Sequence, residues 1–431
     1  MTRAGAEILV LAGKGHNGDD ARFAAEQLPD RQVRVLNVTD PDEAVVEVRG
    51  FAGELLVDGL FGIGLSRPLA GGWLRLVETL NQSPTPILAV DVPSGLDADT
   101  GEPLGDAVRA AVTVTFGAMK RGLWPPKAAP FVGRIEVAAD IGLVPCPFKT
   151  ELNWTLPKDF AHFPPPRPAE GHKGTFGHLA IFAGSQGYHG AAVLAARGAL
   201  RAMPGLVSVF TTERAYPAVA AQLAQAMVHQ WAAGTQLPKS CSAVLFGPGL
   251  AGGDVPEALM QEAVRLWKHS PLPVVVDASA LAWLPAGPTH PGALRVVTPH
   301  PGEAASMLGL AKADVLADRA AMVRNLACDR GNCWVVLKGR HTLIGREQGD
   351  LFLNSSGNPQ LGQGGSGDVL AGYLAGWLAQ PALQADAERT IRHAVWEHGH
   401  AADVLAVRQG AWEMMDLIGC LGNSVQMSPA A

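Results

Sequence analysis

One glycine-rich stretch places a carboxylate where it could act on a hydroxyl beside a phosphate. It reads LGQGGSGDVLAG from Leu361 to Gly372, and an apolar run follows Asp368. Glycines let several backbone N–H groups point at one centre, and the N-terminus of a following helix favours an anion. We expect an aspartate there to stay ionised and to be able to act as a general base. Asp368 would also be a good helix N-cap, so the stretch alone leaves both roles open.

A second glycine-rich turn, GKGHNGDDA, lies near the N-terminus and also follows an apolar run. Farther along the chain, Asp58 and Asp91 each directly follow an apolar run. Ligands of parallel α/β sheets bind beyond the carboxyl ends of the strands, so we expect both carboxylates on the ligand-binding edge. The structural alternatives are a helix cap for Asp58 and a strand-end turn for Asp91 with Ser94.

Short apolar runs separated by helical stretches predict two α/β domains, the first built on a doubly wound parallel sheet. In the first half, the predicted strands are Ile8–Ala12, Val33–Val38, Glu54–Val57, Ile87–Val90 and Val112–Phe116, with helices at Ala21–Gln27 and Trp73–Asn81. In the second half they are His178–Ala183, Ala243–Phe246, Val274–Val276, Arg295–Thr298 and Trp334–Leu337, with helices ending near Met203 and running from Asp368 to about Ala379.

The length of 431 residues is too great for one ordinary core. Between Lys149 and Gly174 the sequence is rich in proline and has no hydrophobic period. We therefore predict a Rossmann-like domain at residues 1–148, a proline-rich linker at 149–171 and a larger α/β domain at 172–431.

Composition narrows the class of protein. The formal net charge is −6 and no basic block is present, which argues against nucleic acid as a partner. The five cysteines are scattered without a CxxC pair, so neither a zinc site nor a disulfide framework is indicated. No apolar run reaches the roughly 18 residues of a membrane span, and we expect a cytoplasmic protein. The helical stretch GAAVLAARGALRAM can pack internally or against a second copy, which leaves a homo-oligomer open.

Several motifs of the second half occur in the order found in one known family. The stretch GNPQLGQGGSGDVLAGYLAGWLAQ resembles the signature of the ADP/ATP-dependent NAD(P)H-hydrate dehydratases, within the ribokinase-like superfamily. Other matches are HKGTFGHLAIFAGSQGYHGAAVLAARGALRAMPGLVSV, FGPGL, VVVDASAL, VVTPHPGEAA and VVLKGRHTLI, and together they cover residues 170–400. The resemblance implies a ribokinase-like fold for the larger domain.

The resemblance also implies a reaction and a set of residues. The family's substrate is an NAD(P)H-hydrate, and the terminal phosphate of ADP or ATP, with Mg²⁺, turns the hydrate's hydroxyl into a leaving group. Asp368 matches the base on that hydroxyl. Residues matching the anion hole are Gly364, Gly365, Ser366 and Gly367; those matching the nucleotide site are Lys338, Gly339, Arg340, His341 and Thr342; those matching the hydrate contacts are Ala191, Gly249 and His300.

These matched residues have structural alternatives. Ala191 could serve close helix packing, Gly249 could be a turn glycine, His300 a hydrogen-bonded surface group and Lys338 a solvated strand end. The chain also departs from the family at Ser279, where an aspartate is common two residues after Asp277. Asp277 itself is present, so we expect a modest change in the pocket.

The N-terminal motifs VLAGKGHNGDDARFAA, VDGLFGIGLSRPL and ILAVDVPSGLDADTGEPLG resemble the NAD(P)H-hydrate epimerase domain. By that match, Asn17, Asp58 and Ser94 would bind K⁺, and Asp91 would be the acid–base group at the nicotinamide ring. The cofactor phosphates would contact Gly62, Ile63, Gly64, Leu65, Ser66, Arg67 and Pro68.

The epimerase turn departs from its family pattern at His16, Asp19 and Ala21. We expect Asp19 to repel a phosphate, and the helical flank that usually precedes the first strand is absent. These departures argue against epimerase activity and favour a non-catalytic first domain. For the second domain, the alternative to a dehydratase is a ribokinase-like small-molecule kinase, which would release a phosphoester.

Overall fold

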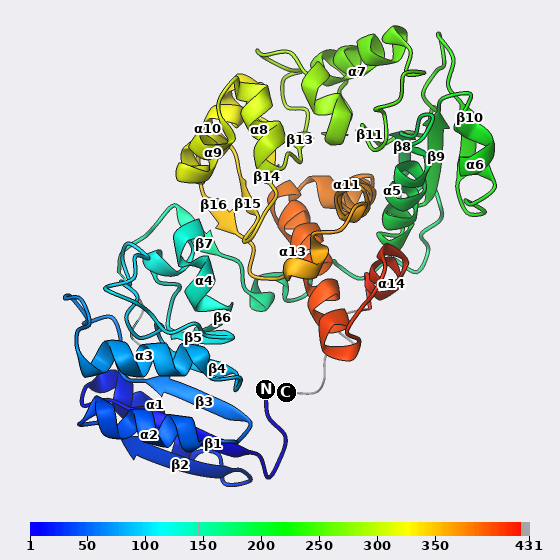
Figure 1. Ribbon diagram of the computed structural model, residues 1–431. Coiled ribbons are helices and arrows are strands. Elements are labelled where there is room, and N and C mark those ends of the chain that lie inside the picture. Colours follow the sequence, from blue (N-terminus) through cyan, green and yellow to red (C-terminus); the bar gives the residue numbers. More distant parts are fainter. Residues whose placement is uncertain (143, 145–146, 424–431) are drawn as a thin grey trace. The chain divides into compact units, whose positions relative to one another are not determined.

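The computed structural model describes residues 1–142, 144 and 147–423. The chain divides into two compact units, Met1–Phe148 and Lys149–Ala431. Each unit contains one sheet, of six and ten strands respectively (Figure 1). No helix of the described residues is long and apolar enough to cross a membrane.

The first unit is built on a parallel sheet in the order β2-β1-β3-β4-β5-β6. Its apolar runs are short and nearly continuous, as expected for strands covered on both faces. The strands are β1 Glu7–Ala12, β2 Gln32–Asn37, β3 Leu55–Gly59, β4 Ile87–Val90, β5 Val112–Phe116 and β6 Arg134–Ala138, and the helices are α1 His16–Glu26, α2 Pro41–Gly50, α3 Gly72–Gln82 and α4 Ala129–Val132.

The second unit has the sheet order β10-β9-β8-β11-β12-β13-β14-β15-β16-β7, and β15 runs antiparallel to both of its neighbours. Its strands are β7 Leu152–Trp154, β8 His178–Phe182, β9 Leu206–Thr211, β10 Met227–Gln230, β11 Ala243–Phe246, β12 Val274–Val276, β13 Arg295–Val297, β14 Trp334–Leu337, β15 Leu343–Gly345 and β16 Leu351–Leu353. Its helices are α5 His189–Arg201, α6 Tyr216–Ala220, α7 Glu257–His269, α8 Pro301–Leu308, α9 Lys312–Ala317, α10 Arg319–Asp329, α11 Ser366–Leu378, α12 Pro381–Gln384, α13 Ala387–Arg408 and α14 Met414–Cys420.

Helices α5, α11 and α13 pack together on one face of the larger sheet, and α7, α8 and α10 lie on the other (Figure 1). The contact between α5 and α11 is very close. A Cβ added to Gly372 would lie 1.9 Å from the carbonyl oxygen of Ala195. The small residues of α5 therefore pack inside the unit, which decides between the two interpretations of that stretch.

Residues 149–171, predicted as a linker, are structured within the second unit. Strand β7 pairs in parallel with β16 and completes the sheet. Phe160 is buried, and its ring packs against His393 and Trp396 of α13. Proline content gave no indication of a strand as short as three residues.

Candidate active site

Asp368 lies in the first turn of α11, at the carboxyl edge of the larger sheet. The helix begins at Ser366, and its N-cap is Gly365, whose φ of 96° is one that glycine adopts without strain. Asp368 is thus the third helical residue, and the N-cap interpretation is wrong. The side chain is free to serve another purpose.

A group of charged side chains from the ends of neighbouring strands surrounds this carboxylate. The Nζ of Lys338 lies 2.8 Å from Oδ1 of Asp277 and 3.8 Å from Oε2 of Glu303. The hydroxyl of Thr298 donates to the same Oδ1 of Asp277 at 2.7 Å. Asp277, Thr298 and Lys338 follow β12, β13 and β14, so the parallel sheet brings them together.

The electrostatics of this group differ from the expectation of an always-ionised base. Burial raises the pKa of Asp368 to about 7, and the nearby negative charges of Asp277 and Glu303 add to the effect, while Lys338 opposes it. Burial disfavours the charge on Lys338, but the carboxylates of Asp277 and Glu303 outweigh it and raise the pKa of Lys338. A base with a pKa near 7 is well placed to exchange protons at neutral pH.

The glycines of the turn leave room at its inner side. A Cβ on Gly367 would lie 3.3 Å from Nζ of Lys338 and 3.9 Å from Oδ2 of Asp277. Gly364 is exposed, whereas Ser366 is buried and contacts the side chain of His398 on α13. The predicted anion-binding turn and the predicted nucleotide stretch therefore meet at Lys338.

The remaining residues of the nucleotide stretch divide into exposed and internal groups. Gly339 and Arg340 are exposed. The His341 ring packs edge-on against Trp154 of β7 at 4.9 Å, and burial lowers its pKa to about 3. The hydroxyl of Thr342 donates to the Gly339 carbonyl at 3.2 Å. The ring of His341 is thus engaged within the protein, and its backbone N–H is the part of this residue that a ligand can use.

The three residues matched to hydrate contacts lie at the same edge of the sheet but have other tasks as well. Gly249, with φ 66°, brings the loop after β11 against the start of α5, where an added Cβ would lie 2.9 Å from that of Ala191. His300 is the N-cap of α8 and accepts from the backbone N–H groups of Gly302 and Glu303. Its side chain is 57% exposed, so Nε2 can still reach a ligand.

In the first unit, the residues matched to K⁺ converge on one buried carboxylate. Asp58 is fully buried and accepts from the hydroxyl of Ser94 at 2.6 Å and from its backbone N–H at 2.8 Å. The amide of Asn17 donates to the Phe61 carbonyl at 3.0 Å, and this carbonyl lies 3.3 Å from the Ser94 hydroxyl. Burial raises the pKa of Asp58 to about 6. No Lys or Arg of the described residues pairs with it, which suits a carboxylate that binds a cation.

Asp91 lies at the end of β4 with a φ of 64°, an unfavourable value for a residue other than glycine. Its Oδ1 lies 2.5 Å from Nζ of Lys120 and accepts from the Thr115 hydroxyl and the Phe116 N–H. Sequence reasoning missed Lys120, although its position just after β5 places it at the ligand-binding edge.

The stretch predicted to contact phosphates, residues 62–68, is mostly exposed. A Cβ on Gly62 would lie 3.2 Å from Asn17, so the stretch begins beside the Asp58 group. Ile63, Lys120 and Arg121 line a cavity of about 640 Å³, which places positive charge where a phosphate could bind.

Asp19 does not present a free charge to this turn. Its carboxylate pairs with Arg22 at 2.7 Å, and this hydrogen bond lowers the pKa of Asp19. Arg22 also donates to the carbonyl of Gly13. The expected repulsion of a phosphate is therefore offset by an adjacent guanidinium.

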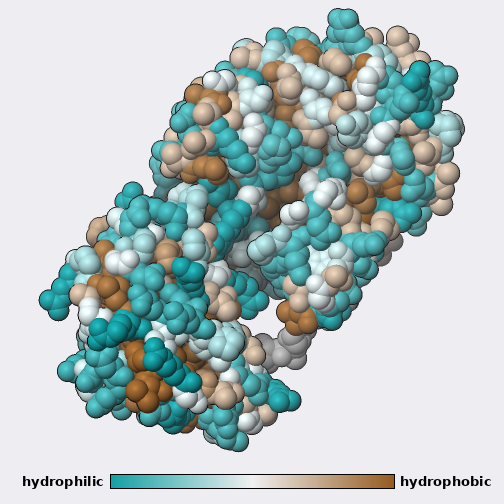
Figure 2. Space-filling model, viewed as in Figure 1, coloured by the Kyte–Doolittle hydropathy of each residue, from teal (hydrophilic) through white to brown (hydrophobic). Residues whose placement is uncertain are grey.

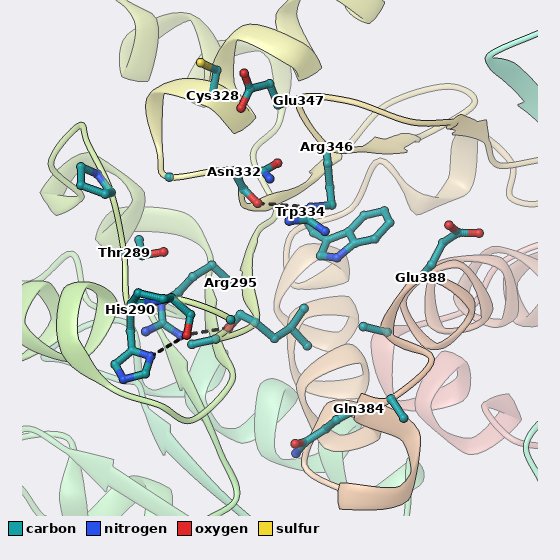
Figure 3. Close-up of a pocket in the computed structure, with 18 of the residues that line it drawn as sticks. Thr289, His290, Arg295, Cys328, Asn332, Trp334, Arg346, Glu347, Gln384 and Glu388 are labelled. Atoms are coloured by element: carbon teal, nitrogen blue, oxygen red, sulfur yellow. Dashed lines mark hydrogen bonds between the residues drawn. The ribbon is translucent and has the colours of Figure 1, made fainter.

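A cavity of about 820 Å³ lies at the opposite, amino-terminal ends of β13 and β14 (Figure 3). Arg295, Trp334 and Arg346 line it, and the residues matched to substrate or nucleotide are absent from its described lining. Size alone therefore does not locate the candidate active site.

On the face seen in Figure 2, hydrophilic side chains cover most of each unit.

Comparisons with known proteins identify the family to which each unit is similar. The family described as NAD(P)H-hydrate dehydratase matches residues 179–421, and the one described as YjeF-related protein N-terminus matches residues 37–122. The bifunctional NAD(P)H-hydrate repair enzyme Nnr of Gloeobacter violaceus is 38% identical over 93% of this chain and 84% of its own length.

Solved structures resemble the second unit. An ADP/ATP-dependent NAD(P)H-hydrate dehydratase from Bacillus subtilis, co-crystallised with ATP and Mg²⁺, is 31% identical with a TM-score of 0.54, covering 61% of this chain and 93% of its own. A ribokinase-like superfamily protein from Enterococcus faecalis, 22% identical with a TM-score of 0.54 over 66% of this chain and 98% of its own, shares the fold. The chain belongs to the family of bifunctional NAD(P)H-hydrate repair enzymes, with an epimerase-type domain followed by a dehydratase domain.

Proposed function

We propose that the second unit converts (S)-NAD(P)H-hydrate to NAD(P)H by phosphorylating its hydroxyl with ATP or ADP and then eliminating phosphate. The observation behind this proposal is the Asp368 carboxylate, with a pKa of about 7, beside the glycine turn and the half-buried Lys338 ammonium. Asp368 accepts the proton of the hydrate's hydroxyl as its oxygen bonds to the terminal phosphorus. The bond from that phosphorus to the bridging oxygen breaks, and the shortened nucleotide leaves.

The second step needs no further enzyme base at the oxygen. The carbon–oxygen bond of the phosphate ester breaks as the electron pair of the ring nitrogen forms a C=N bond, and inorganic phosphate leaves. Transfer of a proton from the adjacent ring carbon to water then restores NAD(P)H. Backbone N–H groups at Gly364 to Gly367 stabilise the phosphoryl charge in both steps. Lys338 adds a positive charge at the same place.

The carboxylates near Lys338 also fit a divalent cation. Oxygen donors are what Mg²⁺ prefers, and Asp277 and Glu303 would hold it beside the phosphates. Mg²⁺ bound with the nucleotide supplies charge that neutralises the phosphate oxygens.

For the first unit we propose epimerisation of the R and S hydrates. Asp91 moves the proton at the ring, and its ion pair with Lys120 orients that carboxylate. K⁺ would be held by Asn17, Asp58, Ser94 and the Phe61 carbonyl, and it supplies charge toward the cofactor phosphates. The pairing of Asp19 with Arg22 removes the main objection to this activity.

An assay of purified protein with (S)-NADH-hydrate and ATP tests the dehydratase proposal. We expect NADH absorbance and free phosphate to rise together. A small-molecule kinase would instead accumulate a phosphoester without NADH, and that result would contradict the proposal. The same assay started from the R hydrate tests the first unit, because it gives NADH only after epimerisation.

A further inference from the structure

A single buried side chain holds the turn at residues 338–342. Arg319, the first residue of α10, donates from Nη1 to the Arg340 carbonyl at 2.8 Å. Its Nη2 donates to the carbonyls of Leu337 at 3.3 Å and His341 at 3.0 Å. Leu337 directly precedes the turn, whereas Arg340 and His341 lie within it. One guanidinium therefore fixes both ends of the turn.

The place of this guanidinium is unfavourable for stability. Arg319 is 5% exposed, and burial lowers its pKa to about 10. A cation at a helix N-terminus also opposes the helix dipole. No carboxylate lies within ion-pair distance of Arg319 in the part of the chain that the structure describes. A buried cation without a counter-charge costs free energy, so stability alone does not explain the place of Arg319.

The three bonds decide which way the peptide groups of the turn face. In a trans peptide the carbonyl and the following N–H point in opposite directions. With the carbonyls of Arg340 and His341 on Arg319, the N–H groups of His341 and Thr342 face away from it. Among the residues that the structure describes, neither N–H has a hydrogen-bond acceptor. Two N–H groups are thus left for an external acceptor at the edge of the site.

We infer that Arg319 is a positioning residue for the nucleotide. It holds the turn so that the N–H groups of His341 and Thr342 meet the nucleotide beside Lys338, and its unneutralised charge adds attraction for phosphate. This inference rests on the proposed nucleotide-dependent function and deepens it. Arg319 acts through the turn and not by direct contact with the substrate.

Arg295 provides a matched control at the other end of the sheet. It is 2% exposed, and burial lowers its pKa to about 10. All of its hydrogen bonds also go to backbone carbonyls, among them those of Trp267 and Leu272. It lines the distant cavity shown in Figure 3. Loss of its hydrogen bonds should affect stability without affecting the nucleotide.

The test compares Arg319→Lys and Arg319→Gln with Arg295→Lys and Arg295→Gln in the full chain. The measurements are the KM for ATP, the KM for (S)-NADH-hydrate, kcat, the melting temperature, and the Kd of ATP by calorimetry without hydrate. We expect both Arg319 variants to raise the KM and Kd for ATP by roughly tenfold or more, with Lys milder than Gln. The KM for the hydrate should change less than about twofold. The Arg295 variants should lower the melting temperature and leave the ATP constants unchanged.

Unchanged ATP constants in the Arg319 variants would overturn the inference. An equal rise in the Arg295 variants would overturn it too, since the effect would then follow general destabilisation. Failure of both Arg319 variants to fold, while those of Arg295 fold, would assign Arg319 to stability alone. If the wild type binds ATP but forms no NADH, the proposed function fails, and the calorimetric comparison still tests Arg319.

Discussion

At the scale of single residues, the two candidate acid–base aspartates have different environments. Asp91 is paired with Lys120 at 2.5 Å, whereas the lysine nearest to Asp368 is bonded to Asp277 at 2.8 Å. Burial, together with the negative charge of Asp277, raises the pKa of Asp368 to about 7, so that it can take a proton at neutral pH. Such perturbed groups gather where catalysis needs them.

Replacement of Asp368 by Asn should abolish turnover and stabilise the fold. We expect kcat to fall by roughly a thousandfold, because the base on the hydroxyl is lost, while ATP binding stays within about twofold. The folded pKa is about 7 against 3.8 for a free aspartate, so ionisation opposes folding as pH rises from about 4 to 7. The melting temperature of Asp368→Asn should thus exceed that of the wild type, more at about pH 8 than at pH 5. A lower melting temperature would indicate a structural role.

The pH dependence of the wild type should show the same group. Only the ionised base accepts a proton, so kcat/KM for the hydrate should rise with pH and level off above about 7. Asp277→Asn removes one charge that raises this pKa and frees Lys338 to lower it. The rising limb should then shift to lower pH. If kcat/KM rose over the same pH range in both proteins, the charge of Asp277 would not influence the pKa of the catalytic base.

A potassium site at Asp58 predicts stabilisation that depends on both cation and pH. K⁺ binds the ionised carboxylate, and the pKa of Asp58 is about 6 without a cation. KCl should raise the melting temperature more than NaCl at equal ionic strength, and the difference should fade as pH drops below about 6. Asp58→Asn should abolish the difference. Equal effects of the two salts on the wild type would exclude a selective site.

At the scale of elements, the short apolar runs predicted ten of the strands, each to within two residues at either end. Six strands of the described residues were not predicted. Three of them, β7, β15 and β16, are three residues each and have no detectable period, and the others are β6, β9 and β10. The Asp368 turn, the Lys338 stretch and the Asp58 group could be found from strand-end motifs. Lys120 and Arg319 were missed, because the pairing of Lys120 with Asp91 and the bonds of Arg319 to backbone carbonyls depend on contacts that no motif encodes.

The close contact of α5 with α11 predicts a strict requirement for small residues. In Gly372→Ala the new methyl would lie 1.9 Å from a backbone oxygen of α5. The two helices would have to move apart to relieve this clash, and that movement costs free energy. We expect a loss of about 1–3 kcal/mol or more in the free energy of unfolding, measured by chemical denaturation.

Gly419→Ala is the matched control for that substitution. Gly419 is helical, and a Cβ there would meet nothing within 4 Å. Its replacement should leave stability unchanged or raise it slightly. Equal stability of the two variants would show that α5 and α11 can separate at little cost.

At the scale of the whole molecule, each unit keeps its charged groups at the carboxyl edge of its own sheet. The first unit places Asp58, Asp91 and Lys120 there, and the second places Asp277, Lys338 and Asp368. Parallel topology explains both arrangements, because it collects strand ends from distant parts of the chain. The order of motifs along the sequence therefore identified the chemistry of each half before the individual contacts could be known.

The central claim is that the nucleotide's terminal phosphoryl group is transferred to the hydrate's hydroxyl oxygen, which then leaves as part of inorganic phosphate. It is tested most directly with (S)-NADH-hydrate carrying a heavy oxygen isotope in that hydroxyl, incubated with the protein, ATP and Mg²⁺. We predict that the label appears in inorganic phosphate, one labelled phosphate for each NADH formed. Label found in water, with NADH formed, would contradict phosphorylation before elimination.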